Sequence, residues 1–172
     1  MIIWVNGAFG VGKTQTSNEL HRRIQNSFFF DAENAGYFIR DNLPEEIAKN
    51  DFQDFEMWRS FNYDMLKYID KNYDGIVIVP MTIVNARYHK EIIGRLRNEG
   101  VEVHDFVLLA SKEVILKRLE KRSEGRDSWA AQQIDRCIDG FKSDIYQYKI
   151  DTNNMTISEV AEEICRILCI EI

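Results

Sequence analysis

The sequence predicts an α/β fold, a three-layer sandwich in which helices cover both faces of a five-stranded parallel sheet. Five short apolar runs recur along the 172 residues, and helix-like segments separate them in strand–helix–strand order. A glycine-rich turn follows the first run and leads directly into a helical pattern. With 45% hydrophobic residues, the chain can bury a sizeable core, and we expect residues 1–172 to form a single domain.

Charge and cysteine content narrow the class of protein. The formal net charge of -6 argues against nucleic acid as a main partner. The 3 cysteines, an odd number without metal-like spacing, fit a reducing compartment, so we expect a cytoplasmic protein. The first apolar run reads as a core strand rather than a signal peptide, and no run is long enough to cross a membrane.

Residues 7–14 carry the most specific motif of the chain. They read G-x-x-x-x-G-K-T, the Walker A phosphate-binding loop, between a strand expected over 1–5 and a helix expected over 14–25, a context that argues against a chance match. Glycines let successive N–H groups point at phosphate oxygens, and the helix start adds free donors and a positive dipole end. We therefore expect Lys13 to reach the β- and γ-phosphates of ATP and the Thr14 hydroxyl to bind Mg²⁺. The nucleotide-binding residues expected in this loop are Gly7, Ala8, Phe9, Gly10, Val11, Gly12, Lys13, Thr14 and Gln15.

Acidic residues close the second apolar run, 27–30. Ligands of open α/β sheets bind beyond the carboxyl ends of the strands, so we expect Asp31 and Glu33 to lie beside the phosphate loop. The alternative for Asp31 is a cap on the helix that the sequence predicts over 33–42. Within that helix, Arg40 either faces a substrate anion or is simply solvated.

The stretch between the second and third strands is rich in aromatic residues. Pro44 and the acids after it predict the start of a helix. The aromatic residues of 52–73 favour core packing, but excess aromatic surface would also suit a sugar, nucleobase or lipid-bearing acceptor, with Arg59 as a candidate substrate-binding cation. The third strand ends at Thr82, a candidate substrate contact, without an acid. Asp31 is therefore the better candidate for Mg²⁺.

A segment of about 118–136 is rich in arginine around a polar break at 123–128. The arginines concerned are Arg118, Arg122, Arg126 and Arg136. A solvated amphipathic helix is the alternative, but phosphoryl transfer needs cations that close over the phosphates, which favours a lid. We expect Arg118 and Arg122 to bind the nucleotide, and the break at 123–128 to be mobile without ligand.

The remaining elements continue the alternation of strands and helices. Strands are expected over 75–82, 101–110 and 148–153, and helices over 85–99 and 157–169. Either Thr156 or Ser158 would cap the last helix. Thr152 and Asn153, in the loop after the fifth strand, either adjoin the nucleotide base or form a plain capping turn.

Taken together, these features look like the small-molecule kinase branch of the P-loop NTPases, to which nucleoside-monophosphate, shikimate and chloramphenicol kinases belong. That resemblance implies the strand order 2-3-1-4-5. More specifically, the chain resembles the tunicamycin resistance protein family of bacilli over nearly its whole length. The segments that carry this resemblance are 2–10, 12–16, 19–23, 78–84, 91–97 and 128–131.

The bacillar resemblance implies an ATP-binding protein that confers resistance to a nucleoside antibiotic with a fatty acyl chain. The bacillar protein has a longer C-terminal tail, thought to be amphipathic and to touch the membrane, whereas this sequence stops at Ile172. We therefore expect no stable membrane insertion, and peripheral contact with a membrane stays open.

Three functions agree with these patterns. The first is an ATP- and Mg²⁺-dependent kinase that phosphorylates a hydroxyl of tunicamycin or a similar amphiphile, with Asp31 or Glu33 accepting the hydroxyl proton. The second is a protein that sequesters the drug under nucleotide control, and the third is a kinase of nucleotide metabolism. The candidate catalytic residues are Lys13, Asp31, Glu33, Arg118 and Arg122, and the candidate substrate-binding residues are Asp31, Glu33, Arg40, Arg59 and Thr82.

Overall fold

A five-stranded sheet forms the centre of the computed structural model, which describes residues 1–171 except 124 and 126. All of its strand pairs are parallel, and the order β2-β3-β1-β4-β5 confirms the prediction. The strands are β1 (Ile2–Gly7), β2 (Ser27–Phe29), β3 (Ile76–Pro80), β4 (Val103–Leu109) and β5 (Tyr148–Asp151). Because the strands run in parallel, their carboxyl ends share one edge of the sheet, where ligands of such sheets bind.

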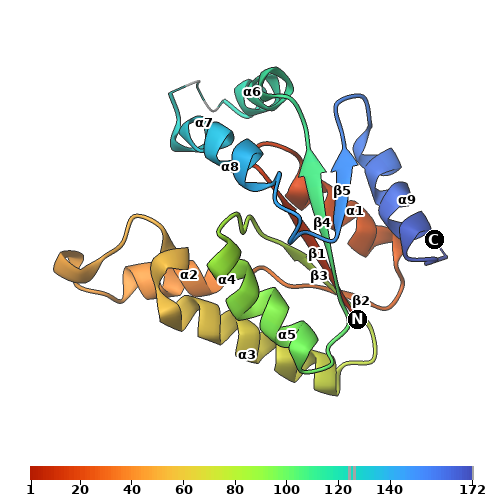
Figure 1. The fold of residues 1–172 in the computed structure, drawn as a ribbon, viewed down its shortest axis with the longest axis horizontal. Helices are drawn as coiled ribbons and strands as arrows, with labels where there is room; N and C mark the ends of the chain where they lie inside the picture. The colour runs from red at the N-terminus through yellow and green to blue at the C-terminus, as the bar shows by residue number, and fades with distance from the viewer. Residues whose placement is uncertain (124, 126, 172) are drawn as a thin grey trace.

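Helices cover both faces of the sheet, as predicted (Figure 1). Successive side chains of β1 point to opposite faces of the sheet, and both kinds are apolar. Ile3 joins a core with the helices of one face, and Trp4 joins a core with those of the other. The first face carries α1 (Lys13–Arg23) and α9 (Ile157–Ile167). The second carries α3 (Glu56–Asn72) and a continuous helical stretch made of α4 (Ala86–His89), a π-helical turn (Lys90–Gly94) and α5 (Arg95–Asn98).

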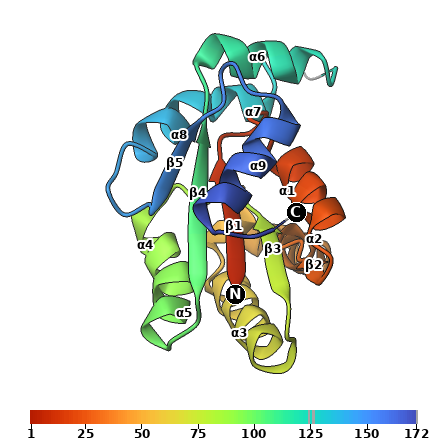
Figure 2. The ribbon, with the colours of Figure 1, turned by 90° about the vertical axis from the view of Figure 1, so that its right-hand side faces the viewer.

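A third apolar cluster lies above the carboxyl ends of the strands (Figure 2). It joins Ala8 of the loop and Val107 of β4 to three helices: α6 (Lys112–Glu120), α7 (Trp129–Gln132) and α8 (Ile134–Gly140). The described apolar residues of the segment 118–136, expected to be a lid, therefore pack beside the phosphate loop. At the far end of the chain, Thr156 caps α9 in a capping box with Glu159, which decides between the two caps proposed for this helix.

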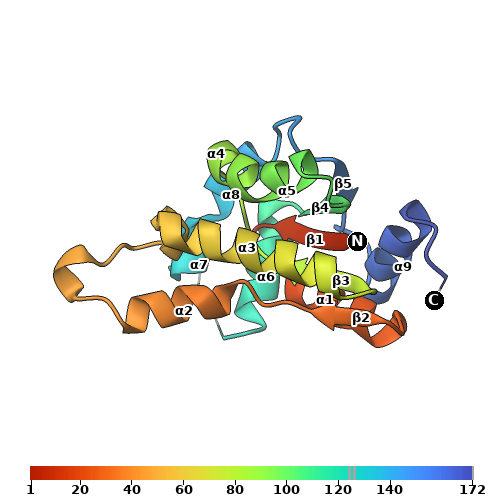
Figure 3. The ribbon, with the colours of Figure 1, turned by 90° about the horizontal axis from the view of Figure 1, so that it is seen from below.

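The chain between α2 (Glu33–Asp41) and α3 reaches away from the sheet (Figure 3). The helix expected to start at Pro44 is reduced to a single 3₁₀ turn, Glu45–Ile47, and a second 3₁₀ turn follows at Phe52–Asp54. Residues 44–50 are exposed throughout, so no apolar face is available to hold a longer helix against the core. Within the described part of the chain, no helix combines the length and apolar character that crossing a membrane requires.

Candidate nucleotide and acceptor site

The loop between β1 and α1 has the backbone that its glycines allow. Gly10 has a φ of 82° and Gly12 a φ of 115°, both in the left-handed region that favours glycine. A Cβ atom on Gly10 would lie 2.7 Å from the side chain of Leu119, so α6 also packs too closely for a larger residue. The loop can therefore curl its N–H groups inward beneath α6.

The start of α1 is suited to an anion. Gly12 caps the helix without a side-chain hydrogen bond, and no acidic residue occupies the first turn. The donors and the positive dipole end of the helix are therefore not offset by a carboxylate. Thr14 and Gln15 are exposed on this turn, beside the loop.

Lys13 folds back over the loop. Its Nζ donates to the Ala8 carbonyl at 3.0 Å and lies 5.2 Å from the centre of the Phe9 ring. Burial lowers the pKa of Lys13 from 10.5 to about 8, because the charged form loses solvation, and the nearby carboxylate of Glu33 only partly offsets this. A polyphosphate beside this ammonium would favour its charged form.

The sheet edge holds the loop in place. Asn6, at the end of β1, accepts hydrogen bonds through Oδ1 from the N–H groups of Gly7 and Ile83, each at 2.9 Å. Thr82 donates from Oγ1 to the Gly7 carbonyl at 2.8 Å, and its own carbonyl accepts from Gln53 Nε2 at 2.8 Å. The buried Thr82 thus supports the loop, and a direct contact between Thr82 and substrate stays a prediction.

Two of the predicted arginines contact the loop side of the site. Arg118 donates from Nη1 to the Val11 carbonyl at 2.7 Å and from Nη2 to the Thr152 carbonyl at 2.8 Å. Arg122 donates from Nη2 to Gln15 Oε1 at 2.8 Å. Burial lowers the pKa of the Arg118 guanidinium from its usual value, which reflects how far this cation is enclosed. Arg118 of α6, Arg122 just after that helix and the phosphate loop therefore form one surface.

This surface encloses a cavity of about 330 Å³, which we call the nucleotide cavity. Its lining residues are Gly10, Val11, Gly12, Gln15, Arg118, Lys121, Arg122, Met155, Thr156 and Ile157. Thr152 lies buried behind it and donates from Oγ1 to the Leu109 carbonyl at 3.0 Å, while Asn153 Oδ1 accepts from the Ser111 N–H at 2.8 Å. Both residues shape the turn after β5, and their contact with a nucleotide base stays a prediction.

A second cavity of about 430 Å³ lies on the other side of the loop, and we call it the acceptor cavity. Its lining residues are Phe9, Glu33, Tyr37, Arg40, Asn50, Asp51, Phe52, Gln53, Met81, Trp129 and Ala130. Glu33 and Arg40, two of the candidate substrate-binding residues, line this cavity, and their contact with a substrate stays a prediction. Glu33 Oε2 accepts a hydrogen bond from the Tyr37 hydroxyl at 2.7 Å, which together with burial raises the pKa of Tyr37 to about 12.

Besides Thr82, two candidate substrate-binding residues lie outside the lining of the acceptor cavity. Asp31 follows β2 at the carboxyl edge, and its Oδ1 accepts from the Glu33 N–H at 2.9 Å, so it also supports the start of α2. Arg59 is 4% exposed, forms an ion pair with Glu91 and donates to the Gln53 carbonyl at 2.5 Å. These contacts give Arg59 a structural role, and its binding of substrate stays a prediction.

The structure adds acceptor-cavity residues that the sequence analysis did not single out. Burial raises the pKa of the Asp51 carboxyl, and Asp51 Oδ2 lies 4.0 Å from Arg136 Nη2 of α8. The ring of Trp129 in α7 packs edge-on against Phe9, with ring centres 4.8 Å apart. No local pattern marks Asp51, because it lies in a polar connection far in sequence from Arg136. Arg126, the remaining lid arginine, lies outside the described residues.

The residues around the loop fit a magnesium nucleotide. Among the described residues, no group of three His, Cys, Asp or Glu side chains could hold a metal ion by itself. Mg²⁺ commonly takes one or two protein oxygens together with phosphates and water. The exposed Thr14 hydroxyl and the Asp31 carboxylate are oxygen donors of that kind at the carboxyl edge of the sheet.

Comparisons with known proteins agree with this geometry. The model of the AAA domain family matches residues 2–143. The solved tunicamycin resistance protein of Deinococcus radiodurans is 33% identical, with a TM-score of 0.84, and the match covers 99% of this chain and 96% of that one. No curated protein sequence matches significantly.

More distant structures share the fold alone. A sugar kinase from Janibacter sp. HTCC2649 is 20% identical, with a TM-score of 0.65 and coverage of 98% of this chain and 94% of the kinase. The APS kinase of Mycobacterium tuberculosis, solved in complex with AMPPNP and APS, is 14% identical, with a TM-score of 0.63 and coverage of 97% and 96%. The sheet order and these likenesses show a P-loop kinase-like fold.

Proposed function

Because this chain belongs to the AAA domain family and to the family of the tunicamycin resistance protein, we propose that it is an ATP-dependent kinase of a small-molecule alcohol. One observation carries the proposal: consecutive residues of the phosphate loop line two different cavities. Phe9 lines the acceptor cavity and Gly10 the nucleotide cavity. A γ-phosphate held by Lys13 would lie at their junction, where a bound hydroxyl can reach it in line.

The transfer needs a group that accepts the proton of the attacking hydroxyl. Glu33 lines the acceptor cavity and is our candidate for this base, while Asp31 is our candidate for holding Mg²⁺ with Thr14. As the hydroxyl oxygen bonds to the γ-phosphorus, the bond to the bridging oxygen breaks and ADP leaves. Lys13, Arg118 and Arg122 would offset the charge on the phosphate oxygens.

The acceptor that we propose is tunicamycin, because the 33% identical relative is a tunicamycin resistance protein. The test incubates the purified protein with ATP, Mg²⁺ and tunicamycin and measures the mass of the drug. We expect a mass increase of one phosphoryl group, with ADP formed in equal amount. Tunicamycin that binds but keeps its mass would reject the kinase and leave a sequestering protein. If tunicamycin is neither bound nor modified, the drug itself is rejected as the ligand.

A pair of variants tests the proposed base. Glu33→Gln keeps an acceptor for the Tyr37 hydroxyl but loses basicity, so turnover should fall by roughly 10²–10⁴ while ATP affinity changes little. Glu113→Gln is the matched control, since Glu113 is also an acid in the first turn of a helix but is exposed on α6. Asp31→Asn should instead raise the Mg²⁺ concentration needed for half-maximal turnover. Equal turnover of Glu33→Gln and Glu113→Gln would remove Glu33 from this role.

A further inference from the structure

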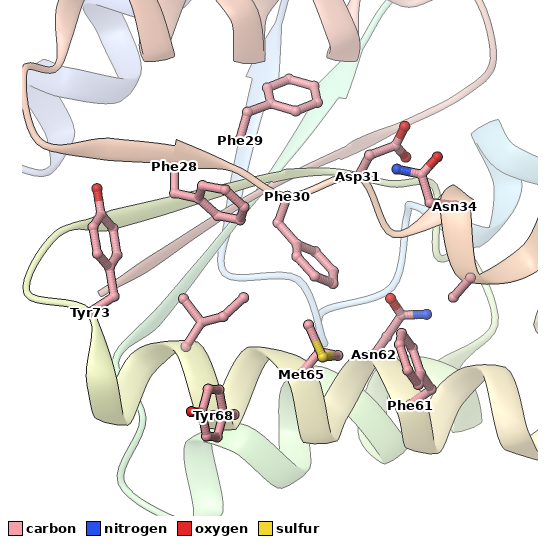
Figure 4. A pocket seen from close by; sticks show the side chains of 12 residues that line it. Phe28, Phe29, Phe30, Asp31, Asn34, Phe61, Asn62, Met65, Tyr68 and Tyr73 are labelled. Carbon is pink, nitrogen blue, oxygen red and sulfur yellow. The ribbon is translucent and has the colours of Figure 1, made fainter.

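An apolar groove of about 780 Å³ lies between the edge strand β2 and α3 (Figure 4). Phe28 and Phe30 project from the β2 side toward α3, and Asn62 and Met65 project from α3 toward β2. An adjoining cavity of about 390 Å³ extends the groove along α2 and shares Ala35 with it. The groove therefore offers a long apolar surface that the nucleotide and acceptor cavities do not use.

One buried polar side-chain atom of this groove has no hydrogen-bond partner among the residues that the structure describes. Asn62 is 0% exposed, and its Nδ2 donates to the Trp58 carbonyl at 2.9 Å. Rotating the amide by half a turn would bring two acceptor oxygens together, so the bond to Trp58 fixes Oδ1 on the other side. That Oδ1 is buried without a hydrogen-bond partner among the described residues. A buried acceptor without a partner is costly and calls for a donor.

The part of the groove near Asn62 carries polar groups. Asp31 and Asn34 lie side by side there, whereas Tyr73 and Phe28 lie at the opposite end (Figure 4). The polar groups and the buried acceptor thus lie between the apolar channel and the adjoining apolar cavity, which joins the groove at Asn34 and Ala35. This arrangement matches a molecule with a polar group and an apolar chain.

We propose that this groove binds an amphiphilic small molecule, an alcohol or secondary amide with an apolar chain, whose O–H or N–H donates to Asn62 Oδ1. The volume lies within the roughly 300–1,000 Å³ of small-molecule sites. Asn62 lines the groove from α3 and is fully buried, so a donor must enter between β2 and α3 to reach its Oδ1 rather than rest on the surface as a partner protein would. The apolar chain then lies along Phe28, Phe30 and Met65.

This site is separate from the acceptor cavity, because α2 lies between them. Glu33 and Tyr37 line the acceptor cavity from one side of α2, while Asn34 and Ala35 line the groove from the other. Asp31, the candidate for Mg²⁺, also lines the groove, so binding in the groove is tested without ATP and Mg²⁺.

Two isomers test the donor directly on the unaltered protein. 1-Decanol can donate a hydrogen bond and methyl nonyl ether cannot, although both have the same atoms. We expect the alcohol to bind roughly tenfold more tightly, the worth of one good hydrogen bond. Binding is followed by NMR of ¹³C-labelled methionine methyl groups: Met65 in the groove should shift, and Met155 in the nucleotide cavity should not.

Variants of two asparagines on α3 provide the matched pair. Asn62→Leu keeps the size but loses the acceptor, so both isomers should bind with similar affinity. The Nδ2 of Asn72 also donates to the carbonyl four residues earlier, that of Tyr68, at 2.7 Å. Asn72, however, is exposed and lies outside the groove. Asn72→Leu should therefore keep the tenfold preference. Ala35→Trp places a large side chain in the groove and should abolish the binding of both isomers.

Specific outcomes would overturn the proposal. Equal affinity of the two isomers for the unaltered protein would show that Asn62 Oδ1 does not select a donor, whether or not Asn62→Leu folds. Shifts at Met155 or Met81 without a shift at Met65 would place the probes in another cavity. No shift at any methionine at saturating probe would reject the groove as a binding site for such amphiphiles.

Discussion

Lys13 couples phosphate binding to its own protonation. Its pKa of about 8 in the free protein lies below its ordinary value because burial disfavours the ammonium. A polyphosphate beside it favours the ammonium and raises that pKa again. Above about pH 8, therefore, the free protein has lost the proton that the complex needs, and binding must take it up.

We predict that ATP affinity falls as pH rises through about 8, with proton uptake on binding. Below that pH Lys13 is already charged in the free protein, so uptake should vanish near pH 7. Calorimetric titrations in buffers of different ionisation enthalpy measure this number directly, and we expect about half a proton or more at pH 8.5. Lys13→Met should bind more weakly and without uptake. The same uptake in Lys13→Met would assign it to another group.

Arg59 shows how a charged side chain on an aromatic helix can be structural. It lies on α3, pairs with Glu91 on the π-helical turn and stacks over Tyr88, with the guanidinium carbon 4.3 Å from the ring centre. The guanidinium of Arg59 therefore joins α3 to the neighbouring helical stretch on the same face of the sheet. A buried charge is costly to leave unpaired, which favours keeping the Arg59 guanidinium in these contacts.

Besides α1, which begins within the phosphate loop, α6 and α7 also contact this loop. Arg118 of α6 bonds the Val11 carbonyl, and the Trp129 ring of α7 lies against Phe9, which also lies beneath the Lys13 ammonium. A ligand that moves the loop should therefore also shift these helices, because they contact it. We propose that they act as the lid over the nucleotide.

Trp129 should report nucleotide binding. It is 50% exposed, whereas Trp4 and Trp58 are buried in the core, so a change in the loop should alter mainly the emission of Trp129. We predict a blue shift of tryptophan emission when ATP and Mg²⁺ are added, because a closing lid removes water from the indole. Trp129→Phe should bind ATP without this shift. An equal shift in Trp129→Phe would mean that the lid does not close over the loop.

Hydrogen bonds connect the phosphate loop to several strands of the sheet. Asn6 and Thr82 tie the loop to β1 and to the end of β3, and Arg118 ties it to the turn after β5. A ligand held by the loop is therefore connected to strands across the sheet. Its binding energy should stabilise the fold as a unit rather than a local segment.

We predict one cooperative thermal transition for residues 1–172, shifted upward by nucleotide. At 100 times its dissociation constant, ATP with Mg²⁺ should add about 2.7 kcal/mol, or roughly 5–10 °C for a domain of this size. Lys13→Ala, at the same ATP concentration, should lose most of the shift and keep the single transition. Differential scanning calorimetry measures both. Two transitions, with nucleotide moving only one, would contradict a single domain.

Much of the fold could be predicted from the sequence because the signals are local. The apolar runs of the strands, the glycines at 10 and 12 and the Thr156 cap each specify the backbone of a few neighbouring residues. The strand order came from resemblance, and the sheet confirms it. The phosphate loop belongs to this class too, since its backbone and Lys13 lie within one turn.

Tertiary structure alone decided which polar side chains find an ion-pair or hydrogen-bond partner within the protein and which remain free to bind a ligand. Arg59 finds Glu91 32 residues away, Thr82 finds the Gly7 carbonyl 75 residues away, and Asn62 Oδ1 finds no partner in the described part of the chain. No local pattern encodes such pairings, because they depend on which elements pack together and how deeply each atom is buried. The shape of the acceptor cavity, and the groove on the other side of α2, arise in the same way.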